Sequence, residues 1–498
     1  MSSLKRNIGL QMSYRILTII TPLITSPIIS RALGAEKIGV YSATQAFANY
    51  FMLFAMLGVE YYGQRTIANC KTREDRSVVF WGIYTVQFGA SIISVAVYYL
   101  SAFFWSPSRF MIMLIQGIWV VSCLFDINWL YFGVEDFKLT VTRNFIVKII
   151  TVFCIILFIR EPKDLTLYAG IMAGSTALSQ VVLWCNIGRY ISFERISLKQ
   201  CKKHVWPIIR LFIPMIALSI YHFMDKTMLD LLSTESEVGY YYAAYKIVYI
   251  PLGLITAIGT VMLPRVSSMI SDSKKRTTAL LDKSTELSIC ISSAVGFGIT
   301  AISREFVPFF FGDGYEKCAT LLALFVPVLF IKALSNIVNQ QYLIPAKCDN
   351  QYTLAVTGGA VVNLICNWLL IPQLGSIGAT LGTLMAELAV LVISVVFAKK
   401  DINFVKMFCK HTYYILFGLI MFFAVRLVDS RLQIGSVFVR LLIMIGTGGL
   451  VYCVLCAVLW WILKDGSVFG SFFISIAKKG KKIDEKYNSI GHKSREEN

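Results

Sequence analysis

Ionisable side chains stand inside several long apolar stretches of this 498-residue chain. A charged group in the hydrocarbon core of a bilayer costs several kcal/mol, so such residues usually pair, face a cavity or act in transport. If the stretches cross a membrane, these side chains can bind an anion, take up a proton or cation, or hold helices together. They are four cations and four carboxylates: Arg15, Lys226, Lys246, Lys332, Asp126, Asp225, Asp230 and Glu387.

Lys246 lies one helical turn from both Tyr242 and Tyr249. An ammonium group flanked by aromatic rings suits a sugar-phosphate ligand, because the ammonium attracts phosphate and the rings stack on sugars. The alternative is that the two Tyr rings only line a contact between helices. The sequence leaves both interpretations open.

The remaining intramembrane charges suggest pairs or coupling sites. Lys226 and Asp230 are i,i+4 neighbours, which predicts an ion pair on one helix face. Asp225 points elsewhere on that helix, so it is a candidate for gating or proton coupling, or for a fixed pair with a Lys. Lys332 and Glu387 fall near the middle of their stretches, where they can pair between the tenth and twelfth spans.

About fourteen apolar stretches position these residues, and each meets the length needed to cross a bilayer. Hydrophobic residues make up 56% of the chain and charged residues only 15%. The sequence therefore predicts an all-α integral membrane protein. The expected spans lie near 10–30, 40–59, 78–104, 111–131, 145–160, 166–187, 208–232, 241–263, 285–303, 318–343, 353–371, 378–398, 413–428 and 437–463.

Lys and Arg are distributed unevenly between the two sides that these spans define. With the N-terminus inside, 33 of the 47 basic residues fall in inside segments and 9 in outside turns. The positive-inside rule then predicts that both termini are cytoplasmic. The net charge of +18 is explained by this bias at an anionic inner leaflet, so no nucleic-acid partner is expected.

No pattern indicates catalysis or a bound cofactor. The chain has no G-x-x-x-x-G-K-[ST] loop for nucleotide phosphates, and no nucleophile and base share a soluble pocket. Most of the twelve Cys residues fall inside apolar spans, where Cys behaves as a small hydrophobe. We therefore expect no enzyme activity, no cofactor and no metal, and any energy would come from an ion gradient, the membrane potential or the substrate gradient.

An internal repeat appears at an offset of 200 residues, where Gly39-Val40-Tyr41 and Gly239-Tyr240-Tyr241 each open a span. Six spans separate the two copies, so both halves enter the membrane from the same side as a parallel repeat. The sequence predicts a six-helix lobe over 1–206, a second over 207–410, two further helices over 411–464 and a basic cytoplasmic tail over 465–498.

Several short motifs, in this order and spacing, resemble the polysaccharide flippase family of the multidrug/oligosaccharidyl-lipid/polysaccharide exporter superfamily. The resemblance covers nearly the whole chain. Its motifs are SPIISRALG at 26–34, GVY at 39–41, FAMLG at 54–58, YGQR at 62–65, DINWLYFGVE at 126–135, MDK at 224–226, GYY at 239–241, AYK at 244–246, LPR at 263–265, FGDG at 311–314 and GSIGA at 375–379.

The resemblance implies two helical lobes around a central cavity that opens alternately to each side of a bacterial cytoplasmic membrane. It implies transport of an undecaprenyl-diphosphate-linked oligosaccharide, such as an O-antigen, capsule or exopolysaccharide repeat unit, to the outer leaflet. Polysaccharide polymerase and glycosyltransferases are the implied partners, beside membrane lipids. Substrate-binding candidates are Arg15, Lys226, Tyr242, Lys246, Tyr249 and Lys332. Candidates for coupling to a proton or sodium ion are Asp126, Asp225 and Glu387.

Three other functions compete with this one. A cation-coupled multidrug exporter and a peptidoglycan-precursor flippase belong to the same superfamily, whereas a membrane-bound glycan polymerase or acyltransferase is a different class. An exporter of lipophilic cations favours an acidic cavity, but four of the eight intramembrane charges here are basic. An enzyme needs a large outside loop or an acid–base group, and the outside turns are short.

Overall fold

The computed structural model describes residues 2–270, 273–399, 401–432 and 434–463, with side chains described from Leu17 onward apart from a few positions in α8, α9 and α17. The described chain is helical and contains no strand. Its residues group into two compact units, which are considered separately below. Unit 1 comprises Met1–Ile250, Val307–Leu324 and Thr353–Ala389, and unit 2 comprises Pro251–Phe306, Phe325–Tyr352 and Val390–Asn498.

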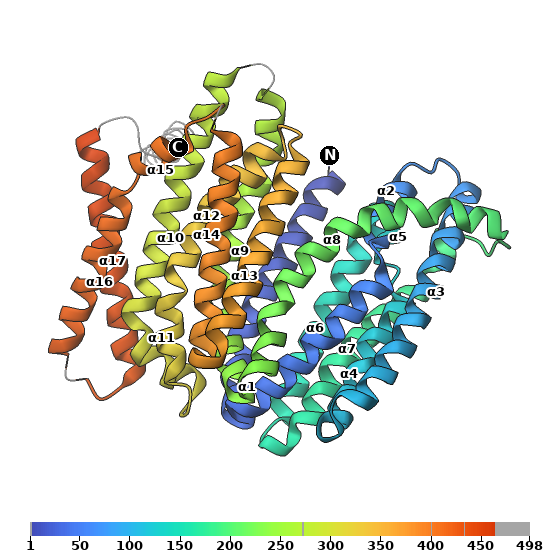
Figure 1. Ribbon diagram of the computed structural model, residues 1–498, viewed down its shortest axis with the longest axis horizontal. Coiled ribbons are helices and arrows are strands. Elements are labelled where there is room, and N and C mark those ends of the chain that lie inside the picture. Colours follow the sequence, from blue (N-terminus) through green and yellow to red (C-terminus); the bar gives the residue numbers. More distant parts are fainter. Residues whose placement is uncertain (1, 271–272, 400, 433, 464–498) are drawn as a thin grey trace, which may run out of the picture. The chain divides into compact units, whose positions relative to one another are not determined.

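Seventeen α-helices follow one another along the described residues (Figure 1). The first eight are α1 (Ser2–Met56), α2 (Val59–Ala68), α3 (Arg73–Trp105), α4 (Phe110–Ser122), α5 (Asn128–Gly133), α6 (Phe137–Phe158), α7 (Leu165–Trp184) and α8 (Leu198–Leu232). The others are α9 (Glu235–Met269), α10 (Lys274–Phe311), α11 (Lys317–Leu324), α12 (Val326–Val338), α13 (Asp349–Leu374), α14 (Ser376–Ala398), α15 (Phe404–Lys410), α16 (Tyr413–Arg431) and α17 (Val437–Leu463).

Twelve helical segments among the described residues are long and apolar enough to cross a membrane. The first, Leu17–Ala68, is 52 residues long, which at about 1.5 Å per residue is more than twice the thickness of a bilayer core. It therefore holds two passes. With the pass expected in α8, these segments account for the fourteen spans that the sequence predicts.

Glycine backbone geometry marks where the first of these long segments divides. Gly34 has φ 75° and ψ 168°, a conformation that breaks α1 between its two passes. Gly58, with φ 77°, separates α1 from α2 in the same way. A residue with a side chain is strained at such φ values, so glycine allows the chain to turn both at position 34 and at position 58.

In unit 1, buried aromatic residues hold the helices between α2 and α8 together. Phe80 of α3 stacks on Trp129 of α5 with ring centroids 5.1 Å apart, and the Trp129 indole donates a hydrogen bond of 3.0 Å to Gln87. Tyr62 of α2 and His204 of α8 form a buried hydrogen bond of 2.8 Å. These contacts join α2, α3, α5 and α8 in one buried framework.

In unit 2, α16 and α17 lie beside α10 (Figure 1). Four charges join one end of these helices. Arg426 contacts Glu305 at 3.0 Å, and Arg440 contacts Asp429 at 2.6 Å.

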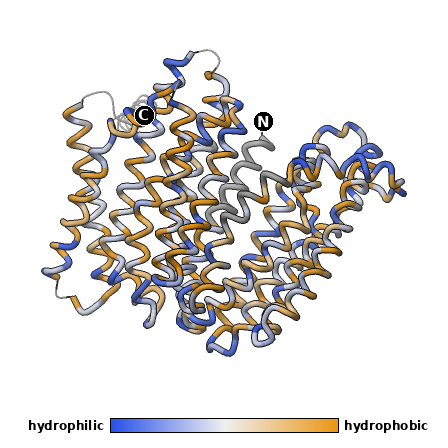
Figure 2. Tube along the Cα trace, in the orientation of Figure 1, coloured by the Kyte–Doolittle hydropathy of each residue, from blue (hydrophilic) through white to orange (hydrophobic). Residues whose placement is uncertain are grey.

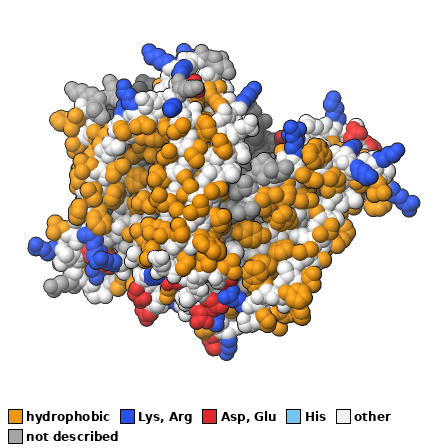
Figure 3. All heavy atoms as spheres, in the orientation of Figure 1, with side chains coloured by type: hydrophobic (Ala, Val, Ile, Leu, Met, Phe, Trp, Pro, Cys, Tyr) orange, Lys and Arg blue, Asp and Glu red, His pale blue; other side chains and the backbone are white. Residues whose placement is uncertain are grey.

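Hydrophobic residues run along the lengths of the helices, and hydrophilic residues are concentrated toward their ends and connections (Figure 2). On the face drawn in Figure 3, hydrophobic side chains likewise cover the middle of the helices.

Candidate functional site

A group of lysines surrounds Tyr242 inside unit 1. The ammonium nitrogen of Lys226, from α8, lies 4.8 Å from the centre of the Tyr242 ring, and that of Lys246, from α9, lies 5.5 Å from it. Both distances are in the range of a cation–π contact. Neither lysine forms an ion pair with a carboxylate in the part of the chain that the structure describes.

Lys148 of α6 lies near enough to Lys246 for the two charges to interact, whereas the lysines described over the Tyr242 ring are Lys226 and Lys246. In the sequence, Lys148 is one of the 33 basic residues that fall in inside segments, and no local pattern links it to Lys246. Like charges near one another inside a membrane repel and lack water, which is costly. The neighbouring Asp225 carboxylate offsets part of this cost at Lys226, and a bound anion would offset more. We name Lys148, Lys226, Lys246 and Tyr242 the lysine cluster.

A small hollow lies beside Lys246, with Ser26, Ser30 and Tyr41 of α1 and Tyr168 of α7 among its lining residues. The hydroxyl of Ser26 is buried and has no hydrogen-bond partner in the described chain. The hollow measures about 20 Å³, enough for about one water molecule. A sugar-phosphate could enter only after the surrounding helices move.

The sequence predicted that Tyr249 flanks Lys246, but in the structure Tyr249 lies outside the lysine cluster. Its ring is mostly exposed and packs against that of Tyr245, at a centroid distance of 5.8 Å. Tyr242 at i−4 faces Lys246, whereas Tyr249 at i+3 lies on a neighbouring part of the helix surface.

The expected ion pair between Lys226 and Asp230 is also absent. Asp230 instead accepts two hydrogen bonds from the guanidinium of Arg109, at 2.7 and 2.9 Å. The same guanidinium donates to Glu235 at 2.7 Å. The planar guanidinium of Arg109 can donate two hydrogen bonds to one carboxylate. Because Asp230 is bound to Arg109, Lys226 can contact Tyr242 instead.

Asp225 is enclosed by neutral donors from three other helices. Its Oδ1 accepts hydrogen bonds from the amides of Asn363 and Asn367 of α13, at 3.0 and 2.7 Å. Its Oδ2 accepts from the hydroxyls of Tyr241 and Thr383, at 2.6 and 2.9 Å. The carboxylate is thus neither unpaired nor bound to a Lys, and these four bonds fill its acceptor capacity.

Asp126 lies in a second polar network of unit 1. Its Oδ1 accepts from the side-chain amide of Asn128 at 2.8 Å, and its Oδ2 accepts from Gln180 at 2.9 Å. Asn128 also accepts from Arg143 at 3.1 Å, so the Arg143 charge reaches Asp126 through one amide. The sequence predicted one uninterrupted span over 111–131. This network instead lies where the chain breaks between α4 and α5.

The other site residues that the sequence predicted are spread along the chain. Glu387 is buried on α14, in unit 1, and Lys332 is partly buried on α12, in unit 2. Because they belong to different units, their pairing stays a prediction. Arg15 is in α1, but its side chain lies outside the described part of the structure.

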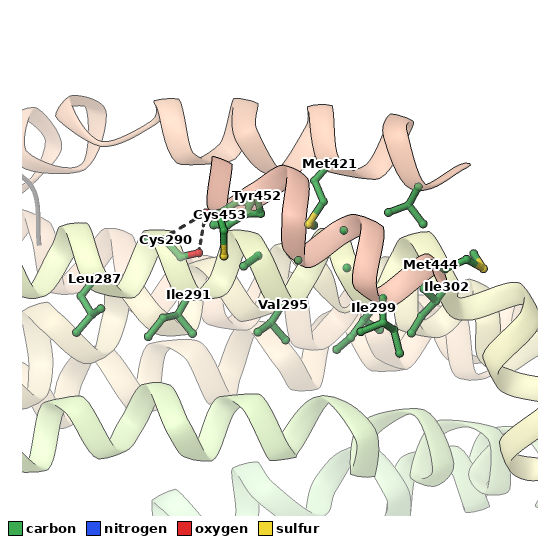
Figure 4. Close-up of a pocket in the computed structure, with 16 residues that line it drawn as sticks. Leu287, Cys290, Ile291, Val295, Ile299, Ile302, Met421, Met444, Tyr452 and Cys453 are labelled. Carbon is green, nitrogen blue, oxygen red and sulfur yellow. Dashed lines mark hydrogen bonds between the residues drawn. The ribbon is translucent and has the colours of Figure 1, made fainter. Parts of the chain in front are cut away.

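An apolar cavity of about 750 Å³ lies in unit 2 between α10, α16 and α17 (Figure 4). Leu287, Ile291 and Val295 extend along one wall, and Met444 lies on another. Tyr452 donates its hydroxyl to the carbonyl oxygen of Cys290 at 2.9 Å, which removes a polar group from the cavity. The sequence did not indicate this feature, because apolar residues in the last spans are equally expected to face lipid.

Fold and site together define a helical membrane protein of many spans with a cationic, aromatic site among its helices. Residues 4–270, more than half of the chain, match the family described as polysaccharide biosynthesis protein. The chain belongs to this family.

Two curated relatives carry the description putative O-antigen transporter. The chain is 23% identical to the one from Escherichia coli over 411 residues, covering 80% of this chain and 97% of the relative. It is 21% identical to the one from Shigella dysenteriae over 396 residues, covering 78% and 98%. A probable low-salt glycan biosynthesis flippase from Haloferax volcanii is 24% identical over 170 residues, which cover 33% of this chain and 35% of the relative.

Solved transporter structures share the fold. A lipid II flippase in an inward closed conformation superimposes with a TM-score of 0.72 at 17% identity, covering 91% of this chain and 99% of that one. An inward-facing multidrug transporter of the MATE family, in the MOP superfamily, gives a TM-score of 0.59 at 14% identity, covering 80% and 95%.

Proposed function

We propose that this chain is a flippase for a lipid-linked oligosaccharide, moving it from the cytoplasmic to the outer leaflet of a bacterial cytoplasmic membrane by alternating access. The observation that carries the proposal is the lysine cluster, in which the ammonium groups of Lys226 and Lys246 lie over one Tyr ring inside the membrane and Lys148 lies near Lys246. Its chemistry suits a diphosphate next to a sugar. The relatives described as O-antigen transporters support the same substrate class.

The lipid part of such a substrate needs an apolar surface. The cavity between α10, α16 and α17 offers one, and we propose that it accommodates part of the polyprenyl chain. Within unit 1, we propose separately that the oligosaccharide occupies a polar space near the lysine cluster, which must widen beyond the small hollow beside Lys246. Widening and closing of this space is the movement that alternating access requires.

Asp225 is the residue to which we assign coupling, by a proton or a sodium ion. A proton on Oδ2 would make that oxygen a donor and reduce its capacity to accept, which would break the present pattern in which Tyr241 and Thr383 both donate to it. A sodium ion would need oxygen ligands, so the Asn363 and Asn367 amides would have to turn their oxygens toward it. Either event would change the contacts between α8, α13 and α14. Asp126 and Glu387 remain secondary candidates.

The lysine cluster is tested by replacing Lys246. In proteoliposomes loaded with a short undecaprenyl-diphosphate oligosaccharide, an impermeant glycan-modifying enzyme measures how much substrate reaches the outer leaflet. Lys246→Ala is expected to abolish translocation and Lys246→Arg to keep part of it, because the charge survives. Lys163→Ala, which alters an exposed ion pair with Glu161, is the matched control and should transport normally. Normal translocation by Lys246→Ala would remove the basis of the proposal.

The same assay separates the competing functions. Selective transport of a peptidoglycan precursor over other undecaprenyl-diphosphate glycans would favour the precursor flippase, which shares the fold. A multidrug exporter would move lipophilic cations, and Lys226 and Lys246 in the site oppose such a substrate electrostatically. A change in the covalent structure of the glycan would indicate an enzyme.

A further inference from the structure

A second cationic site lies in unit 2. It is a hollow of about 680 Å³ between the first turns of α10 and the short helix α15. Lys274 and Lys275 border it from α10, and Lys406 and Lys410 border it from α15. Figure 1 places α15 in the connection between α14 and α16. This hollow is called the α10–α15 pocket below.

The carboxylates of the pocket do not neutralise its lysines. Asp282 is already engaged by Lys410 at 2.5 Å and by His411 at 2.9 Å. Asp401 lies 4.0 Å from Lys274, and both side chains are largely exposed, so this pair is weak. Lys275 and Lys406 have no carboxylate partner within the described residues. The rim of the pocket therefore presents unpaired positive charge.

The floor of the pocket is apolar and firmly held. Ile402 and Met407 are buried there, and Phe404 packs beside them in the same hydrophobic cluster. The side chain of Asn403 caps α15 by accepting a hydrogen bond of 2.9 Å from the backbone N–H of Lys406. The Lys406 ammonium is thus carried by a helix that is fixed at its start and along its buried face.

An apolar floor beneath an ammonium rim matches an amphiphile with an anionic head. All four lysines stand in segments that the positive-inside rule assigns to the cytoplasmic face, where the leaflet carries anionic lipids. We propose that the α10–α15 pocket binds the phosphate of an anionic phospholipid, with Lys275 and Lys406 contacting the phosphate and Ile402 and Met407 contacting the glycerol region. The bound lipid would fix the connection that leads into α16 and α17.

Lipid binding to the purified full-length chain tests this proposal. Phosphatidylglycerol and zwitterionic phosphatidylcholine are titrated in detergent, and bound lipid is counted by native mass spectrometry. Wild type should prefer phosphatidylglycerol, and the double variant Lys275→Gln, Lys406→Gln should weaken that binding by about tenfold or more. The double variant Lys275→Arg, Lys406→Arg should retain it, because both charges remain.

A matched control removes the same charge elsewhere. Lys199 and Lys202 are exposed on α8 and are also assigned to the cytoplasmic side, so Lys199→Gln, Lys202→Gln should leave phosphatidylglycerol binding unchanged. Equal losses in the two Gln variants would overturn the proposal, as would no loss in either. Thermal unfolding midpoints within a few degrees of wild type show that the variants are folded.

Two competitors distinguish other sources of phosphate. Displacement of phosphatidylglycerol by millimolar inorganic phosphate would indicate a simple phosphate site and overturn the lipid assignment. Tighter binding of undecaprenyl diphosphate than of phosphatidylglycerol would indicate a substrate entry site and overturn it as well. The result is independent of the proposed function, because Lys246→Ala should stop translocation while leaving phosphatidylglycerol binding intact.

Discussion

Gly39 of α1 and Gly239 of α9 make a reciprocal contact. A Cβ atom on Gly39 would lie 1.7 Å from the carbonyl oxygen of Glu235, and one on Gly239 would lie 2.0 Å from the carbonyl oxygen of Ala35. Residues 35–39 and 235–239 are related by the same offset as the sequence repeat. Two equivalent segments that contact each other through equivalent residues are the arrangement that a twofold axis between α1 and α9 produces.

This contact predicts a strong effect of adding one methyl group. Gly239→Ala should force α1 and α9 apart and lower the stability of the folded protein by about 1–3 kcal/mol. The loss would appear as a lower thermal unfolding midpoint in detergent. Gly89→Ala on α3 is the control, because a Cβ there meets nothing within 4 Å. If both substitutions lower the unfolding midpoint equally, the close contact at Gly239 does not explain the loss of stability.

The positive-inside bias predicts the orientation of the chain. In a background without Cys, a single Cys placed at Lys202 or Lys275 should be protected from an impermeant thiol reagent added to intact cells. A single Cys at Ser236, in an expected outside turn, should react. Detergent permeabilisation should then expose the first two positions. Labelling of position 202 from outside would reverse the topology and with it the direction of transport.

Lys148 provides a test of the lysine cluster that the sequence did not suggest. Lys148→Ala should weaken binding of the anionic substrate by about tenfold, as expected for losing one charged partner in a poorly hydrated site. The fall should appear as a higher substrate concentration at half-maximal translocation. Lys148→Arg should restore most of the affinity. Unchanged half-saturation in the Ala variant would mean that Lys148 is only a neighbour of Lys246.

The fold was largely predictable from the sequence, whereas the site was predictable only where neighbours in sequence are neighbours in space. Long apolar stretches specify helical spans directly, and Tyr242 meets Lys246 because they are one turn apart on α9. The Asp230 partner could not be found in this way, since Arg109 is 121 residues away and no local pattern links them. Lys148 was missed for the same reason, because a Lys near the end of a span usually only anchors it.

The Arg109 ion pairs predict a coupled response to substitution. Arg109→Ala leaves Asp230 and Glu235 close together and partly buried without their shared cation, which should destabilise the protein by about 1–3 kcal/mol. Adding Asp230→Asn and Glu235→Gln to the Arg109→Ala variant should recover much of this loss, because the uncompensated charges are gone. Unfolding midpoints of the single, double and triple variants measure the coupling. Additive losses would show that the ion pairs contribute little.

Asp225→Asn separates a coupling role from a scaffold role. The Asn side chain keeps the shape of Asp but replaces one acceptor oxygen with an NH₂ group, which cannot accept from its present donors. Asn also carries no negative charge and cannot be neutralised by a proton. Coupling requires that two conformations bind the proton or sodium ion at position 225 with different affinities, and Asn removes that difference. In proteoliposomes with an imposed pH or sodium gradient, Asp225→Asn should lose the gradient-dependent part of translocation while still binding substrate.

Thr383→Val is the matched control for Asp225→Asn, since it removes one hydrogen bond to Oδ2 and keeps the carboxylate. It should lower stability slightly and preserve gradient dependence. The gradient that Asp225→Asn makes ineffective identifies the ion, because a proton-coupled protein loses its response to pH and a sodium-coupled one its response to sodium. If Asp225→Asn binds substrate and still responds fully to both gradients, Asp225 has only a structural role in holding α8, α9, α13 and α14 together.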